Sequence, residues 1–229
     1  MGAPRDPMPV DVMAVVMPET TPFAPAPVVL TGHHVRLEPL NAGHAEGVLA
    51  AGHHASLWMV TVQPPLSSPE AVAAYLAAAQ ASVSRGDEVV FAIVARDTGK
   101  LLGSTRWTDI ARAHRRVEIG GTWLTPRVQG TLVNTEAKYL QLVHLFEVLG
   151  AVRVQFKTDL RNSQSQRALE KLGATREGVL RRHMIVRDGF VRDSVYYGIT
   201  DLDWPGVKRR LAERLMAGGE GGDRADQHF

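Results

Sequence analysis

The sequence predicts an α/β fold in which helices flank a mixed, mostly antiparallel, twisted sheet of about seven strands. Two observations support this prediction. Short apolar runs alternate with helical patterns in the order β-α-α-β-β-β-α-β-α-β-β. Residues 89–124 hold three consecutive strands, which favours an antiparallel meander, whereas the strand–helix–strand unit that follows requires a parallel pair.

Proline and capping residues place the elements of the first half. Pro39 ends a strand, Asn41 is a good N-cap, and Ser68-Pro69-Glu70 is a typical helix start with proline at the first helical position. The Asp-Thr-Gly-Lys sequence at 97–100 indicates a hairpin turn. The predicted elements are a strand over 28–38, helices over 41–53 and 68–86, and strands over 89–96, 101–110 and 117–124.

Glycines place the elements of the second half. Gly150 and Gly173 are helix stops, and Asp188-Gly189 is a dipeptide favoured in type I′ hairpin turns. Residues 152–160 alternate between apolar and polar, which is typical of a strand. The predicted elements are a helix from near Asn134 to Leu149, a strand over 152–160, a helix over 163–172, a hairpin of 178–187 with 190–200, and a final helix from Pro205.

Composition bounds the organisation of the chain. Seven prolines within residues 1–27 predict a disordered leader, residues 28–217 are long enough for one domain, and the glycine-rich residues 218–229 predict a flexible tail. The net charge of +2 does not favour nucleic acid, and no apolar run reaches the ~18 residues of a membrane span. We therefore expect no direct nucleic-acid partner and no membrane. The absence of cysteine excludes disulfides and thiol nucleophiles and fits a cytoplasmic location.

A loop between the predicted strand 117–124 and the next helix carries the first functional signal. Pro126 ends the strand, and Arg127 and Gly130 precede the helix. A glycine-containing loop that leads into a helix N-terminus presents free backbone N–H groups at the positive end of the helix dipole. This pattern indicates a phosphate site and a nucleotide-like cofactor, although an ordinary strand–helix turn would look the same.

Several local sequences, taken in order, resemble the GNAT superfamily of acetyl-CoA-dependent N-acetyltransferases, and most closely its ribosomal-protein N-terminal acetyltransferases. They are residues 32–37, 116–120, 127–138, 162–165, 170–174 and 177–181. The resemblance implies acetyl-CoA as cosubstrate and no metal. It also implies direct acetyl transfer, in a ternary complex, to a primary amine of a protein N-terminus or of a small molecule such as an antibiotic or polyamine. We expect a monomer or homodimer. A non-catalytic acyl-CoA-binding domain is the rival interpretation.

The resemblance also implies where coenzyme A binds. The family's loop motif falls on residues 127–132, with Leu132 in place of the small final residue. Strands 117–124 and 152–160, the fourth and fifth, are expected to splay around a bulge at Gly120-Gly121 and to admit the pantetheine arm. The implied cofactor contacts are Trp123, Leu124, Arg127, Val128, Gln129, Gly130, Thr131, Leu132, Val133, Asn134, Asn162 and Ser165.

The implied catalytic residues are Glu118 and Ser165. Glu118 lies on the strand that enters the loop and is the candidate base; a solvated glutamate, or one paired with Arg115 or Arg116, is the alternative. Ser165 is placed to serve the departing thiolate, unless its hydroxyl only satisfies backbone groups of the helix. Trp58, Trp107, Arg181 and His183 are candidates for the acceptor pocket, with core or hairpin packing as the alternative for each.

Overall fold

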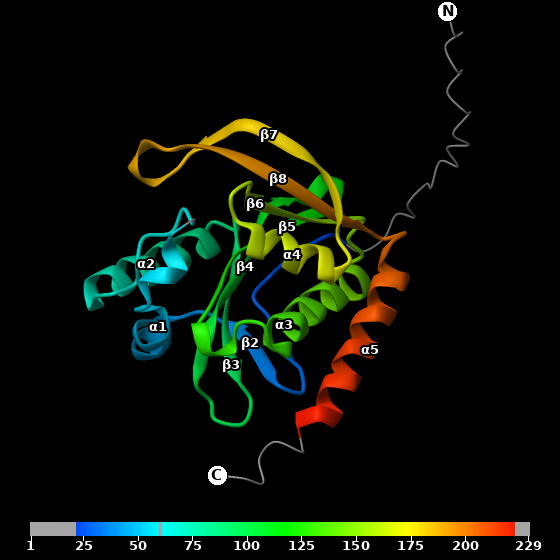
Figure 1. Cartoon of the computed structure of the whole chain (residues 1–229), viewed down its shortest axis with the longest axis horizontal. Coiled ribbons are helices and arrows are strands. Elements are labelled where there is room, and N and C mark those ends of the chain that lie inside the picture. The colour runs from blue at the N-terminus through cyan, green and yellow to red at the C-terminus, as the bar shows by residue number, and fades with distance from the viewer. Residues whose placement is uncertain (1–21, 60, 223–229) are drawn as a thin grey trace, which may run out of the picture.

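The computed structural model of the protein describes residues 22–59 and 61–222. In this part of the chain an eight-stranded sheet carries helices on both sides, which confirms the predicted fold class (Figure 1). The strands are β1 (Leu30–Thr31), β2 (Val35–Pro39), β3 (Val89–Ala95), β4 (Leu101–Ala111), β5 (Arg116–Leu124), β6 (Arg153–Asp159), β7 (Thr175–Ile185) and β8 (Val191–Thr200). The helices are α1 (Ala45–Gly52), α2 (Pro69–Ser84), α3 (Leu132–Val143), α4 (Ser163–Leu172) and α5 (Trp204–Gly222).

The strands follow the order β1-β2-β3-β4-β5-β6-β8-β7. Every neighbouring pair is antiparallel except β5 and β6, which α3 connects as a parallel crossover. The sheet is therefore mixed, as the strand–helix–strand unit predicted. No helix among the described residues is long and apolar enough to cross a membrane.

Two hydrophobic cores lie on opposite faces of the sheet. Helices α1 and α2 lie on one side, and α3, α4 and α5 lie on the other (Figure 1). Strand β3 is covered on both faces, because Val89, Phe91 and Ile93 join the core under α3 while the residues between them join the core under α2. This explains why residues 89–95 are apolar without alternation.

Local capping chemistry fixes the helix that follows β5. The Thr131 hydroxyl accepts the Val133 N–H at 3.3 Å, so α3 begins at Leu132, two residues before the predicted Asn134. At its far end α3 continues into a single π-helical turn (His144–Val148), and Gly150 then takes a φ of +65°. Helix α4 ends at the predicted glycine, Gly173, which has a φ of +93°.

The first predicted strand is split in two, which gives eight strands where about seven were expected. Glu136 of α3 accepts the backbone N–H groups of His33, His34 and Val35 at 2.7, 2.7 and 2.8 Å. Three amides that converge on one carboxylate cannot also serve a straight strand, so the chain turns between β1 and β2. The partners lie more than a hundred residues apart, which hides the contact from local sequence patterns.

The chain begins to pack before the predicted domain boundary at residue 28. Phe23 is buried in the core under α3, and the guanidinium of Arg115 lies 5.7 Å from its ring centroid. Residues 1–21 of the expected leader and residues 223–229 of the expected tail lie outside the described residues. The backbone of α5 continues to Gly222, past the predicted end of the domain at residue 217.

Candidate active site

The parallel strands β5 and β6 pair over only three residues and then separate. Arg116, Val117 and Glu118 face Arg153, Val154 and Gln155, and the two strands, both fully described, do not pair beyond this point. Strand β6 stays paired with β8 along its whole length, and β5 stays paired with β4 as far as Leu124, so the sheet divides between β5 and β6. Beyond Glu118 the backbone of β5 has lost its β6 partner, which creates a fork in the sheet.

A bulge in β5 accompanies this separation. Arg106 of β4 faces Gly120, but Ser104 faces Trp123, so Gly121 and Thr122 together oppose the single residue Thr105. Gly121 takes a φ of +56°, a conformation that glycine adopts most readily. The bulge consists of Gly121 and Thr122 and so begins one residue beyond Gly120, the first residue of the Gly120-Gly121 pair at which the resemblance implied it.

Glu118 is the last residue of β5 that pairs with β6, so its carboxylate lies where the fork opens. The side chain is buried, and it is paired neither with Arg115 nor with Arg116, which donate to other groups. Its oxygens contact Gln155 Nε2 at 3.2 Å and Lys157 Nζ at 3.4 Å. Neither predicted alternative, a solvated glutamate or an arginine pair, describes this environment.

The face of the sheet that carries Glu118 is polar across four strands. Strand pairing places Thr108, Gln155, Lys157 and Tyr196 on the same face as Glu118, because cross-strand partners point the same way. The opposite face of these strands is the apolar core, with Trp107, Val117, Val154 and Tyr197. Along each strand, alternate residues therefore lie either on the polar face with Glu118 or in the apolar core.

The loop before α3 offers unused backbone donors. Gly130 has a φ of +80°, and a Cβ at this position would meet no atom of the described chain within 4 Å. Within the described residues, the N–H groups of Gly130 and Leu132 make no hydrogen bond, and both lie at the positive end of α3. Open space beside free amides fits an anion such as a pyrophosphate.

The N-terminus of α4 faces this loop. Asn162 caps α4 by accepting the Ser165 N–H at 2.9 Å, so backbone capping does not occupy the Ser165 hydroxyl. That hydroxyl makes no hydrogen bond with the described residues, in contrast to the alternative interpretation. Gln129 donates to the Leu124 carbonyl at 3.0 Å and accepts from Gln164 of α4 at 3.1 Å. The hydrogen bond between Gln164 and Gln129 therefore joins the helix that follows β6 to the loop that follows β5.

The other predicted cofactor contacts surround the fork. Trp123 and Leu124 are the last residues of β5 and are buried, one in each core. Arg127 and Val128 form a short 3-10 turn (Pro126–Val128) that carries the arginine side chain outward. Val133 and Asn134 belong to the first turn of α3, and the buried Asn134 Oδ1 has no hydrogen-bond partner among the described residues.

The four acceptor candidates do not form one group. His183 lies beside Tyr196 and Ser194, with His183 Nδ1 at 3.1 Å from Ser194 Oγ. Arg181 is exposed on β7. Trp58 and Trp107 are fully buried in opposite cores, Trp58 against Trp123 and Trp107 against Phe91 and His144, which matches the packing alternative.

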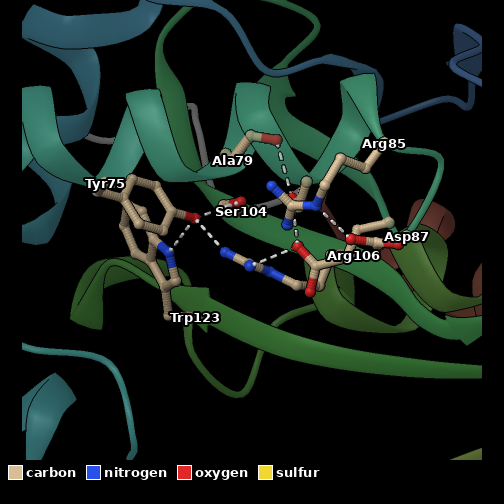
Figure 2. A network of polar contacts seen from close by, with 9 residues as sticks. Tyr75, Ala79, Arg85, Asp87, Ser104, Arg106 and Trp123 are labelled. Carbon is tan, nitrogen blue, oxygen red and sulfur yellow. Dashed lines mark hydrogen bonds and ion pairs between the residues drawn. The ribbon is translucent and has the colours of Figure 1, made fainter.

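A pocket of about 910 Å³ between α2 and β4 was not apparent from the sequence. Figure 2 shows the network beside it, in which the Tyr75 hydroxyl donates to Ser104 Oγ at 3.0 Å and accepts from Arg106 Nη2 at 3.3 Å. Asp109 lines the same pocket and accepts from Gln155 Nε2 at 3.0 Å, while that amide also donates to Glu118. The side chain of Gln155 therefore lies between Asp109 of the pocket and Glu118.

Burial and nearby charges shift the pKa values of two groups near Glu118 in opposite directions. Burial raises the pKa of Tyr196, and the negative charges of Glu118 and Asp109 raise it further. Burial lowers the pKa of His183, and Lys157 and Arg192 add to that effect. The sequence analysis did not identify Tyr196 and Arg192 as site residues. A strand pattern shows which alternate residues share a face, but it does not show which face carries the polar site.

A buried lysine on α3 was also missed. Lys138 Nζ donates to Thr105 Oγ1 at 3.1 Å and to Thr122 Oγ1 at 2.6 Å, and so contacts both strands at the bulge. Burial lowers the pKa of Lys138 to about 7. The arrangement ties α3 to the distorted part of β5 through a group that is easily neutralised.

Comparisons with known proteins agree with this geometry. A putative acetyltransferase from T. thermophilus is 41% identical with a TM-score of 0.75, and the match covers 83% of this chain and 98% of that one. Mycobacterium smegmatis RimJ in complex with CoA-disulfide shares the fold, with a TM-score of 0.67 at 24% identity over 85% of this chain and 97% of that one. The uncharacterized N-acetyltransferase YoaA of Bacillus subtilis (strain 168) is 33% identical over 104 residues, 45% of this chain and 58% of its own length.

A family model supplies the assignment. The model of the acetyltransferase (GNAT) domain matches residues 34–175, which is more than half of the chain. The matched range includes both strands of the fork, the loop before α3 and the N-terminus of α4. Taken with the forked sheet, this match shows that the chain belongs to the GNAT acetyltransferase family.

Proposed function

We propose that the protein transfers an acetyl group from acetyl-CoA to a primary amine by direct attack in a ternary complex. The observation that carries this proposal is the fork between β5 and β6, with Glu118 at its apex. Acetyl-CoA supplies the acetyl group as a thioester. The amine belongs to a protein N-terminus or to a small molecule, and the pocket between α2 and β4 is the proposed approach to Glu118.

The chain's own groups can bind the cosubstrate at two places. The Gly130 and Leu132 amides, with Arg127 nearby, suit the pyrophosphate because they are donors at a helix N-terminus. The open strand edge beyond Glu118 suits an extended arm that carries amide groups, because unpaired strand groups bind such a chain as another strand would.

Three groups divide the chemistry among them. Glu118 accepts a proton from the ammonium through water, since a carboxylate with only two contacts among the described residues keeps lone pairs free. A backbone N–H near Trp123 or Leu124 stabilises the thioester oxygen as negative charge develops. The free hydroxyl of Ser165 donates to the sulfur as the thiolate leaves.

The pH dependence of turnover tests these roles. In a free-thiol release assay, Glu118→Gln should lose about 10²–10⁴-fold in rate near neutral pH, and the deficit should shrink as pH rises and free amine accumulates. Ser165→Ala should lower turnover at all pH values, because it acts on the leaving group. Coenzyme A affinity, measured by calorimetry, should stay near wild type in both variants.

The outcome separates an enzyme from a binding domain. Coenzyme A binding without thiol release for any amine would support a non-catalytic acyl-CoA-binding domain. Wild-type turnover by Glu118→Gln over about pH 6–9 would remove Glu118 from the mechanism. Mass spectrometry of products from a panel of peptides and small amines would identify the acceptor class.

A further inference from the structure

Arg192 of β8 is a buried cation that makes no hydrogen bond with the described residues. Its side chain is only 8% exposed, and Arg192 Nε has no partner in this part of the chain. Its nearest acidic oxygen is Asp159 Oδ2, at 4.0 Å from Nε. Burying a guanidinium is costly unless it is paired and hydrogen-bonded, so an unsatisfied one calls for an explanation.

Asp159 does not supply the missing partner, because another arginine already holds it. Arg161 donates to Asp159 through its backbone N–H at 2.8 Å, through Nε at 3.0 Å and through Nη2 at 2.8 Å. Both carboxylate oxygens are thus occupied by Arg161. Arg192 contributes only a longer-range attraction to this pair.

Arg192 shares its surroundings with the proposed catalytic base. Strand alternation and pairing place Arg192 on the same face as Tyr196, Lys157 and Glu118. Burial lowers the pKa of Arg192, while the negative charges of Asp159 and Glu118 act in the opposite direction. Arg192 and Lys157 both lower the pKa of His183, whereas Glu118 raises it.

We propose that Arg192 binds an anionic group of the acceptor, so that the preferred acceptor is a primary amine that also carries a carboxylate. This inference rests on the proposed acetyl transfer and adds the acceptor's chemical class. A carboxylate fits the planar fork of a guanidinium, and it would satisfy donors that the described chain leaves unpaired. Glu118 then serves the amine end of the acceptor, and Arg192 serves its acid end.

Two sources could present this chemistry, and paired substrates separate them. The first pair is β-alanine and β-alaninamide, which differ only in the carboxylate of a small molecule. The second pair is the peptide amides Asp-Ala-NH₂ and Asn-Ala-NH₂, which differ only in the side chain of the N-terminal residue. Turnover of each would be followed by free-thiol release.

One variant and one matched control test the role of Arg192. We expect the wild type to prefer the carboxylate of at least one pair by about 10-fold or more in kcat/KM, equivalent to about 1.4 kcal/mol. Arg192→Gln should abolish that preference, mainly by raising KM for the acid. Arg182→Gln, which removes an exposed positive charge from the same hairpin, should keep the preference.

The possible failures point to different conclusions. Equal kcat/KM within both pairs for the wild type, or an unchanged preference in Arg192→Gln, would overturn the inference. No thiol release with any amine would instead contradict acetyl transfer. In that case calorimetry with N-acetyl-β-alanine still tests the site, since binding that is lost in Arg192→Gln supports it and equal binding overturns it. If Arg192→Gln does not fold, Arg192→Lys should keep the charge but weaken the preference.

Discussion

Two glutamates on opposite faces of the sheet are equally buried but differently bonded. Glu118 and Glu136 are each 4% exposed. Glu136 accepts three backbone N–H groups at 2.7–2.8 Å, whereas Glu118 contacts one amide at 3.2 Å and one ammonium at 3.4 Å. A carboxylate whose lone pairs are filled by fixed donors is a structural anchor. Burial alone therefore does not identify a reactive group; unused hydrogen-bonding capacity does.

The largest expected effect is a difference in stability between the two variants in which each glutamate is replaced by glutamine. Glu136→Gln places an NH₂ against backbone donors and removes the charge that three of them share. We expect it to lower the free energy of unfolding by about 3 kcal/mol, measured by urea denaturation. Glu118→Gln should change that free energy by less than about 1 kcal/mol, because it loses only weak contacts. Equal destabilisation by the two variants would make Glu118 an anchor as well.

A second prediction concerns two backbone N–H groups that have no hydrogen-bond acceptor among the described residues. Unlike the amides that hold Glu136, the Gly130 and Leu132 amides have no acceptor among the described residues, and the space beside the Gly130 Cα is open. Gly130→Asp and Gly130→Asn have nearly equal size, and both residues tolerate positive φ. The aspartate should weaken coenzyme A binding by about 10-fold more than the asparagine, about 1.4 kcal/mol. Calorimetry that finds equal affinities would show that no anion binds there.

The smallest expected effect concerns Lys138, a buried charge of opposite sign two residues from Glu136. Its pKa is about 7 in the folded protein, against an ordinary value of 10.5. Between these two values the unfolded chain binds more protons, so the free energy of unfolding should rise with pH. Relative to Lys138→Met, the wild type should gain about 1 kcal/mol from pH 7 to pH 8. Parallel urea titrations of the two proteins would check this, and identical pH slopes would contradict it.

The sequence was sufficient for most of the fold because local signals determine it. The strand predicted over 89–96 is Val89–Ala95, and that over 117–124 is Arg116–Leu124. Ser68 and Pro69 begin α2 as predicted. These elements depend on alternation, caps and turn residues that lie within a few positions of each other.

The features that escaped prediction depend on distant contacts. The turn between β1 and β2 is set by Glu136, about a hundred residues away. Tyr196 shares a face with Glu118 only because β8 pairs with β6 and β6 pairs with β5, which no local pattern shows. The hairpin turn was expected as type I′ and is a 3-10 turn (Arg187–Gly189), although Gly189 has the expected positive φ of +74°. Trp58 and Trp107 were acceptor candidates because a large aromatic residue suits a pocket and a core equally.

The bulge in β5 shows how the sequence can determine the fork between β5 and β6. One extra residue opposes Thr105, and on both sides of it the side chains already point to their proper faces. Deleting Gly121 would therefore keep Trp123 and Leu124 in their cores while making β5 a regular strand that can continue along β6. We expect such a protein to fold and to lose coenzyme A binding, which calorimetry and denaturation would show together. In this protein a single insertion in one strand would separate a closed, inert sheet from one that can bind a cosubstrate.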